Sequence, residues 1–251
     1  MTLRSIVAAA AALVFTNVAQ SAEIRLLASG ALKEAYLELL PNFEKASGHT
    51  VSAAWSNTTD IRKRVAEGYV ADLVILGSDG TEALLKDGKL VASTRTGFAT
   101  SRIYVAVRAG APRPNISSGD ALKRALLAAK SVAYSSGASG TYIVTMLKTL
   151  DVYDEVSSKA SVTRANEPVG GKVARGEAEI GFHQLSELIP VQGIDIVGPL
   201  PPEVQQVTVF SGALHSGAKQ PEAATALAKF LVSPAAADSI RKHGLEPASP
   251  N

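Results

Sequence analysis

Small polar residues and glycines gather where strand-like apolar segments give way to helical ones. They occur at Ser29-Gly30, Ser56 to Thr59, Ser135 to Thr141, and Asn166. One such residue is enough to cap a helix, and the second and third runs exceed that need. A helix N-terminus carries unpaired N–H groups and a partial positive charge, so it can hold an anion. The spacing therefore predicts an anion-binding cleft.

The histidines and arginines allow a catalytic role without establishing one. His183 lies near the end of the apolar segment "EIGFHQ" and is either a structural histidine or a proton-transfer group. Arg62 follows the second polar run and is either a ligand contact or a solvated side chain. The four histidines lack metal-ligand spacing, and no phosphate loop, dinucleotide fingerprint or nucleophile elbow is present. The sequence thus predicts neither a metal nor an organic cofactor.

Alternating strand-like and helical segments place these residues on an α/β scaffold. Apolar runs such as "EIRLLAS" and "ADLVILGS" alternate with segments of helical period. The pattern begins again near residue 100, and long strands are predicted near residues 100–108 and 204–212. We expect two lobes, each a doubly wound mixed sheet flanked by helices. Lobe 1 comprises residues 23–100 and 205–251, lobe 2 comprises residues 101–204, and the cleft lies between them.

The N-terminal segment and the composition indicate an exported protein. Residues 1–22 have the form of a signal peptide, with Arg4 before an apolar run and cleavage expected after Ser21 or Ala22. The chain has no cysteine, so its stability must come from a full-sized core, as in a periplasmic protein. A net charge of +2 without a basic block argues against nucleic-acid binding.

Three segments carry a resemblance to a known family. "EIRLLASGALKEAYLELLPNFEKASGHTV", "WSNTTDIRKRVAEGYVADLVILGS" and "GEAEIGFHQLSEL" resemble the periplasmic molybdate-binding proteins of ABC importers. The resemblance implies the two-lobed type II periplasmic-binding fold and a small oxyanion held by neutral hydrogen bonds. It also implies delivery of that anion to an inner-membrane ABC permease. We expect the protein to be a monomer.

Carrying the family's ligand contacts onto this chain gives a changed site. Ala31 stands where the family has a serine, with Ser29 two residues earlier, while Thr58 keeps the hydroxyl of a second serine. Gln184 replaces a tyrosine, so two hydroxyl donors are lost in all. Backbone amides of the family correspond to Ser139 and Asn166. The residues expected to bind the ligand are Ser29, Gly30, Ala31, Thr58, Ser139, Asn166 and Gln184.

The changed site also resembles that of a periplasmic aconitate isomerase with the same fold. This resemblance implies a proton shift across a tricarboxylic acid. His183 would be the base, and helix N-termini with Arg62 or Lys33 would hold the carboxylates. The sequence favours a binding protein for a molybdate-like oxyanion or an organic carboxylate, with the isomerase as the alternative.

Overall fold

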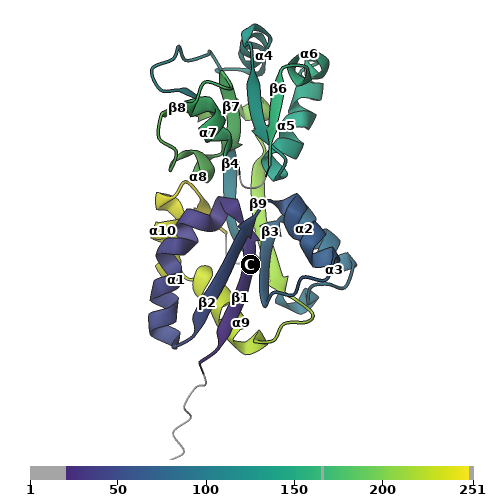
Figure 1. Ribbon diagram of the computed structural model, residues 1–251, viewed down its shortest axis with the longest axis vertical. Helices are drawn as coiled ribbons and strands as arrows, with labels where there is room; N and C mark the ends of the chain where they lie inside the picture. Colours follow the sequence, from purple (N-terminus) through teal and green to yellow (C-terminus); the bar gives the residue numbers. More distant parts are fainter. Residues whose placement is uncertain (1–20, 165–166, 249–251) are drawn as a thin grey trace, which may run out of the picture.

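The protein consists of two α/β lobes stacked along its long axis (Figure 1). The computed structural model describes residues 21–164 and 167–248. Strands β4 and β9 run from one lobe into the other. Figure 1 shows the short helix α8 close to the boundary between the lobes.

The strands pair in the order β2-β1-β3-β9-β4-β7-β5-β6, with β8 and β10 pairing to β4. Pairing is parallel between β1 and both β2 and β3, and between β5 and both β6 and β7. It is antiparallel where β4 and β9 take part. The strands are β1 Glu23–Ser29, β2 Thr50–Ser56, β3 Leu73–Gly77, β4 Thr96–Arg108, β5 Val132–Ser135, β6 Ala160–Thr163, β7 Ile180–Gln184, β8 Ile194–Pro199, β9 Val207–Leu214 and β10 Glu246–Pro247.

Helices cover the faces of these sheets and begin mostly at strand ends. The α-helices are α1 Lys33–Ser47, α2 Thr58–Ala66, α3 Ser78–Lys86, α4 Gly119–Ala128, α5 Ala138–Thr149, α6 Tyr153–Ser157, α7 Val169–Ala174, α8 Leu185–Leu188, α9 Pro221–Leu231 and α10 Ala237–Lys242. Short 3-10 helices are η1 Gly30–Leu32, η2 Ala92–Thr94, η3 Pro202–Val204 and η4 Pro234–Ala236.

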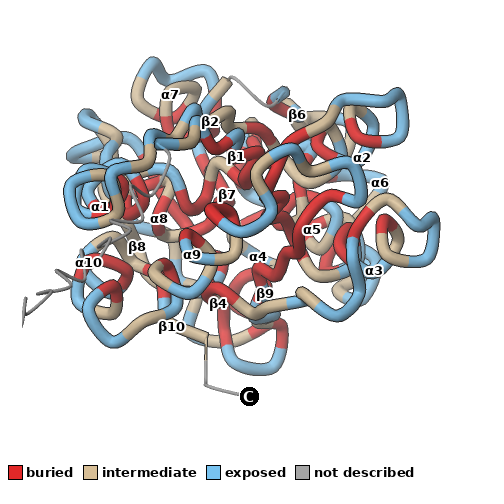
Figure 2. Tube along the Cα trace, turned by 90° about the horizontal axis from the view of Figure 1, so that it is seen from below, coloured by how far each residue is buried: buried red, intermediate tan, exposed pale blue. Residues whose placement is uncertain are grey.

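Separate apolar clusters fill the two ends of the molecule. One packs α1, α9 and α10 against the β1 side of the sheet, around Tyr36 and Phe210. Another packs α4, α5 and α6 against β4, β5 and β7, around Phe182. Figure 2 shows the buried segments, in red, concentrated in the interior, while the helices expose their outer sides. The lobe boundaries given above stay a prediction.

Helix α2 begins earlier than its apolar period suggests. The sequence predicts a start at Asp60, whereas α2 starts at Thr58 and Asn57 is its N-cap, accepting a hydrogen bond from Asp60 N. The polar run therefore supplies both the cap and the first turn.

The export signal falls mostly outside the structure. Residues 1–20 of the predicted signal peptide are not among the described residues. Within residues 21–164 and 167–248, no helix has the length and apolar content needed to cross a bilayer.

Candidate functional site

A cavity of about 510 Å³ lies between the lobes. Its wall in the first lobe comes from the end of β1, η1 and the β2–α2 junction. Its wall in the second lobe comes from the β5–α5 junction, the end of β6 and the β7–α8 junction. These are the polar junctions of the sequence: in each lobe the parallel strands end at one edge of the sheet, and the cavity lies between the two edges.

In the wall of the first lobe, the backbone already uses part of the hydrogen-bonding capacity. Ser29 Oγ accepts a hydrogen bond from Ala31 N at 3.4 Å. Thr58 Oγ1 accepts one from Gly77 N at 3.0 Å. The Thr58 hydroxyl can still offer its O–H hydrogen, together with one remaining lone pair, to a ligand.

In the wall of the second lobe, the chain turns tightly into α5. Ser135 Oγ accepts a hydrogen bond from Gly137 N at 3.2 Å and lies 3.1 Å from Ser139 Oγ. A Cβ on Gly140 would lie 1.5 Å from the Ser135 carbonyl oxygen, so only glycine allows this approach. The tight turn brings the two hydroxyls and the start of α5 to the cavity.

The two longest polar runs contact each other across the lobes. Asn57 Nδ2 donates to Ser136 Oγ at 3.3 Å, and Thr59 Oγ1 donates to the Ser136 carbonyl oxygen at 3.3 Å. Part of the excess of polar residues in these runs thus connects the lobes. Capping and ligand binding do not have to account for all of it.

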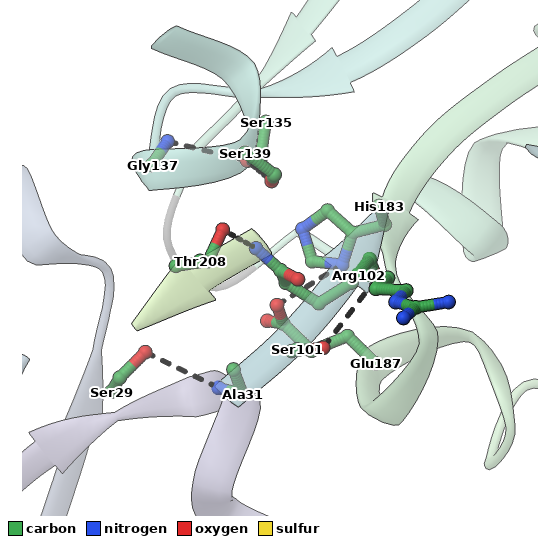
Figure 3. Close-up of polar contacts among 11 residues, drawn as sticks. Ser29, Ala31, Ser101, Arg102, Ser135, Gly137, Ser139, His183, Glu187 and Thr208 are labelled. Atoms are coloured by element: carbon green, nitrogen blue, oxygen red, sulfur yellow. Dashed lines mark hydrogen bonds and ion pairs between the residues drawn. The ribbon is translucent and has the colours of Figure 1, made fainter. Parts of the chain in front are cut away.

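The β7–α8 junction brings ionisable side chains into the cavity (Figure 3). His183 is 6% exposed, and its Nδ1 lies 3.2 Å from Glu187 Oε2. That contact has an ion-pair distance but is not a hydrogen bond, and in the part of the chain that the structure describes Nδ1 has no hydrogen-bond partner. The neighbouring Gln184 Nε2 donates to Thr208 Oγ1 on β9 at 2.7 Å.

Unpaired polar atoms concentrate around this cavity. Among the described residues, five buried side-chain polar atoms lack a hydrogen-bond partner, and four of them belong to lining residues. A buried polar atom without a partner costs about 1–3 kcal/mol, so the cavity favours a polar occupant. The four atoms are Thr163 Oγ1, His183 Nδ1, Gln184 Oε1 and Ser186 Oγ.

The cavity lining carries both signs of charge. Lys33 and Arg164 supply positive charge. Glu34, Glu167 and Glu187 supply negative charge, and Lys33 Nζ lies 3.8 Å from Glu34 Oε1. The Glu187 side chain keeps 28% of its surface exposed, yet the surrounding protein raises the pKa of its carboxyl group. Burial is the larger cause, and the adjacent His183 opposes it.

Most residues predicted for the site do line the cavity. They are Ser29, Gly30, Ala31, Lys33, Thr58, Ser139, His183 and Gln184. Their roles as ligand contacts stay a prediction. Asn166 lies outside the described residues.

Arg62 does not line the cavity, which favours the solvated side chain over the ligand contact for this residue and leaves Lys33 as the candidate for holding a carboxylate. It sits on the exposed side of α2, with its Cδ directed toward Gly80 of α3. Arg164 is the arginine in the lining instead.

The sequence interpretation missed Thr163, Arg164, Ser186 and Glu187. The four-residue β6 was not recognised as a strand, so Thr163 had no strand end to mark it. Glu187 follows His183 by four residues, and helical spacing would have paired them had the single turn α8 been recognised. No group of three or more His, Asp or Glu side chains within the described ranges could hold a metal ion.

Comparison with known proteins gives the fold and the family. An aconitate isomerase from a Pseudomonas species is 40% identical over 230 residues, covering 89% of this chain and 87% of that protein. A molybdate-binding protein from Azotobacter vinelandii is 27% identical over 238 residues, covering 90% of each.

The structure of the Azotobacter vinelandii periplasmic molybdate-binding protein superimposes with a TM-score of 0.73 at 18% identity. The match covers 91% of this chain and 100% of the other. The predicted two-lobed α/β fold of periplasmic binding proteins is thereby confirmed. A family described as bacterial extracellular solute-binding protein matches residues 24–246, and the chain belongs to that family.

Proposed function

We propose that this protein isomerises aconitate, or a related unsaturated polycarboxylic acid, in the cavity between its lobes. The observation that carries the proposal is a buried imidazole, His183, facing an anion-receptive cavity beside a carboxyl group. The 40% identity to an aconitate isomerase over 89% of the chain supports the same function. It supports the isomerase better than the binding protein that the sequence favours.

The dimensions of the cavity suit a ligand with several carboxylates. At about 510 Å³ it falls within the range of pockets that enclose organic molecules. Lys33 and Arg164 line it, together with the start of α5 and the hydroxyls of Ser135 and Ser139. These separated groups could each receive one carboxylate.

The chemistry requires one base and a site that tolerates a delocalised anion. A base removes a proton from the methylene carbon beside the double bond, and the charge spreads over the allylic carbons and their carboxylates. Return of the proton to the far carbon moves the double bond, and the product can form with the other geometry. His183 would be the base, and nearby hydrogen-bond donors would stabilise the anion.

The ligand contacts that we propose are those of the sequence interpretation plus two neighbours. Ser29, Gly30, Ala31, Thr58, Ser139, Asn166 and Gln184 are retained, and Thr163 and Arg164 are added. The reaction as written consumes no cofactor. The chain would act in the periplasm after removal of its signal peptide.

The test is turnover of trans-aconitate by the purified mature chain, followed by chromatographic separation of the cis and trans isomers. We expect conversion by the wild type and a loss of about 100-fold or more in His183→Gln. His243→Gln is the matched control, because His243 contacts Glu38 and does not line the cavity. Unchanged turnover in His183→Gln would remove His183 as the base.

Capture of a small anion for an ABC importer is the second candidate, and the family assignment favours it. A thermal-shift panel of molybdate, sulfate, citrate and aconitate separates the two candidates. A ligand at a thousandfold its Kd adds about 4 kcal/mol to stability. Stabilisation by an anion that the protein does not convert, with no turnover of aconitate, would establish binding alone.

A further inference from the structure

We infer that Glu187 is a second catalytic residue of this cavity, and that it forms with His183 a carboxyl–imidazole pair that carries protons between two carbons of the bound acid. This inference rests on the proposed function.

The β7–α8 junction fixes the pair locally. His183 is the penultimate residue of β7, and the single turn of α8 follows directly after Gln184. Glu187 is thereby folded back toward the strand, and its Oε2 lies 3.2 Å from His183 Nδ1. Figure 3 shows the two side chains directed toward each other. Both residues line the cavity, so a ligand there is within reach of both.

Glu187 differs from the other acidic residues in the lining. Glu34 Oε1 lies 3.8 Å from Lys33 Nζ, and Glu167 Oε1 lies 2.9 Å from Lys172 Nζ. Within the described ranges, the only polar contact found for Glu187 is the one with His183. Figure 3 shows the guanidinium group of Arg102 directed away from the pair. Burial therefore raises the pKa of the Glu187 carboxyl, and His183 opposes the shift only in part, so the carboxyl holds its proton to a higher pH than an exposed glutamate does.

The carboxyl group of Glu187 also reaches the opposite lobe. Its Oε1 lies 3.3 Å from the position that a Cβ on Gly30 would occupy. Gly30 begins η1 in the first lobe, and the missing side chain leaves room for this approach. Glu187 therefore stands between the two walls, where a ligand enclosed by both lobes must pass close to it.

The pair can complete the proton shift without an external reagent. His183 takes a proton from the methylene carbon, and protonated Glu187 gives its own proton to the far carbon of the allylic anion. The C–H bond broken and the C–H bond formed balance, and the double bond moves by one position. An imidazolium and a carboxylate remain, and one proton crossing their 3.2 Å contact restores the starting charges.

Other ionisable groups around the cavity could contribute to a pH profile. They are Lys33 and Glu34 from the start of α1, and Arg164 and Glu167 beside the end of β6. Burial raises the pKa of Glu187, so activity that needs its proton should fall as pH rises through that pKa. Removal of the carboxyl should abolish this limb of the profile, and neutralising Glu34 should leave it in place.

The experiment compares the wild type with Glu187→Gln, Glu187→Asp and the matched control Glu34→Gln. Turnover of trans-aconitate gives kcat, KM and the pH profile. Calorimetry with citrate, which has no double bond to shift, in buffers of different ionisation enthalpy gives the protons taken up on binding. We expect Glu187→Gln to lower kcat by about 100- to 10,000-fold, because general acid–base catalysis contributes that much.

The same variant should keep the KM of the wild type, lose the falling limb of the profile and lose proton uptake with citrate. Glu187→Asp, which keeps an ionisable group, should retain part of the activity. Wild-type kcat and proton uptake in Glu187→Gln would overturn the inference and leave the isomerase function standing. No turnover by the wild type would overturn the isomerase and with it the catalytic role of Glu187, and citrate-linked proton uptake that depends on Glu187 would then identify this residue as a proton-binding group of an anion site.

Discussion

Two acidic residues, the buried Asp72 and the partly buried Glu187, meet opposite environments in this protein. Asp72 is 2% exposed, and its Oδ2 accepts a hydrogen bond from Arg25 N at 2.8 Å. Its Oδ1 accepts from Lys219 N at 2.6 Å and from Gln220 N at 2.9 Å. Among residues 21–164 and 167–248, the polar contact found for Glu187 is the one with His183 at 3.2 Å. A carboxylate surrounded by N–H donors holds the fold together, whereas one without donors remains available to a ligand.

The same difference separates the two buried histidines. His215 Nδ1 accepts a hydrogen bond from Gly217 N at 2.9 Å, and burial lowers the pKa of its imidazole. His183 lines the cavity, and its Nδ1 has no hydrogen-bond partner among the residues that the structure describes. The backbone therefore occupies Nδ1 of His215, whereas it leaves Nδ1 of His183 unpaired at the cavity within the described residues.

Replacing Asp72 with alanine should have the largest effect on stability. Asp72→Ala removes the acceptor from three backbone N–H groups that come from distant parts of the chain. We expect the free energy of unfolding to fall by about 3 kcal/mol, measured by urea denaturation. Asp195→Ala is the control, because its hydrogen bond to Gly110 N is exposed. A loss no larger than that of the control would show that water replaces the carboxylate.

Two threonine-to-valine substitutions compare a hydroxyl that is bonded to the backbone with one that is not, using the same chemical change. Thr58→Val removes the acceptor of the Gly77 N–H group. It should therefore lower the free energy of unfolding by about 1–2 kcal/mol, besides weakening any ligand binding. Thr163→Val removes a fully buried hydroxyl for which the described ranges contain no hydrogen-bond partner. It should leave the stability of the unliganded protein unchanged or higher while weakening ligand binding. Urea denaturation and titration calorimetry measure the two quantities, and equal stability losses would contradict the distinction.

The pH dependence of stability should show that ionised Glu187 destabilises the folded protein. The pKa of Glu187 is higher in the folded protein than in the unfolded chain. Its contribution to the free energy of unfolding is therefore fully present below the unfolded pKa and is lost as pH rises through the folded pKa. Glu187→Gln should therefore have a higher Tm than the wild type at pH 7, and this advantage should shrink toward pH 4. Thermal denaturation across that range measures it, with Glu34→Gln as control. A constant difference in Tm would mean that Glu187 does not titrate in this way.

Adding a methyl group at Gly30 should produce the smallest change. In Gly30→Ala, the new Cβ would lie 3.3 Å from Glu187 Oε1, close enough to displace the carboxyl slightly. We expect a loss of about 1 kcal/mol in transition-state stabilisation, or roughly fivefold in kcat/KM, without a change in Tm. Gly119→Ala is the control, since its Cβ would meet its neighbours at 3.6 Å, an ordinary contact, and Gly119 does not line the cavity.

Long, regular elements could be predicted from the sequence. The apolar run from Glu23 to Ser29 is β1 as expected, and the amphipathic period after Leu32 is α1, including Pro41 within the helix. Short elements could not be predicted, because four or five residues give too little periodicity. The strand Ala160–Thr163 and the helices Tyr153–Ser157 and Leu185–Leu188 were missed for this reason.

By itself, the sequence determined the α/β alternation, the polar residues at the strand ends and the family resemblance, because each depends on neighbouring residues. The tertiary structure decided which of those polar groups are hydrogen-bonded within the protein. Asp72 and Thr58 are paired by backbone from other elements, whereas Glu187, His183 and Thr163 are left to the cavity. Hydrogen-bond satisfaction depends on contacts between segments far apart in the chain, so only the folded arrangement could separate structural groups from those available to a ligand.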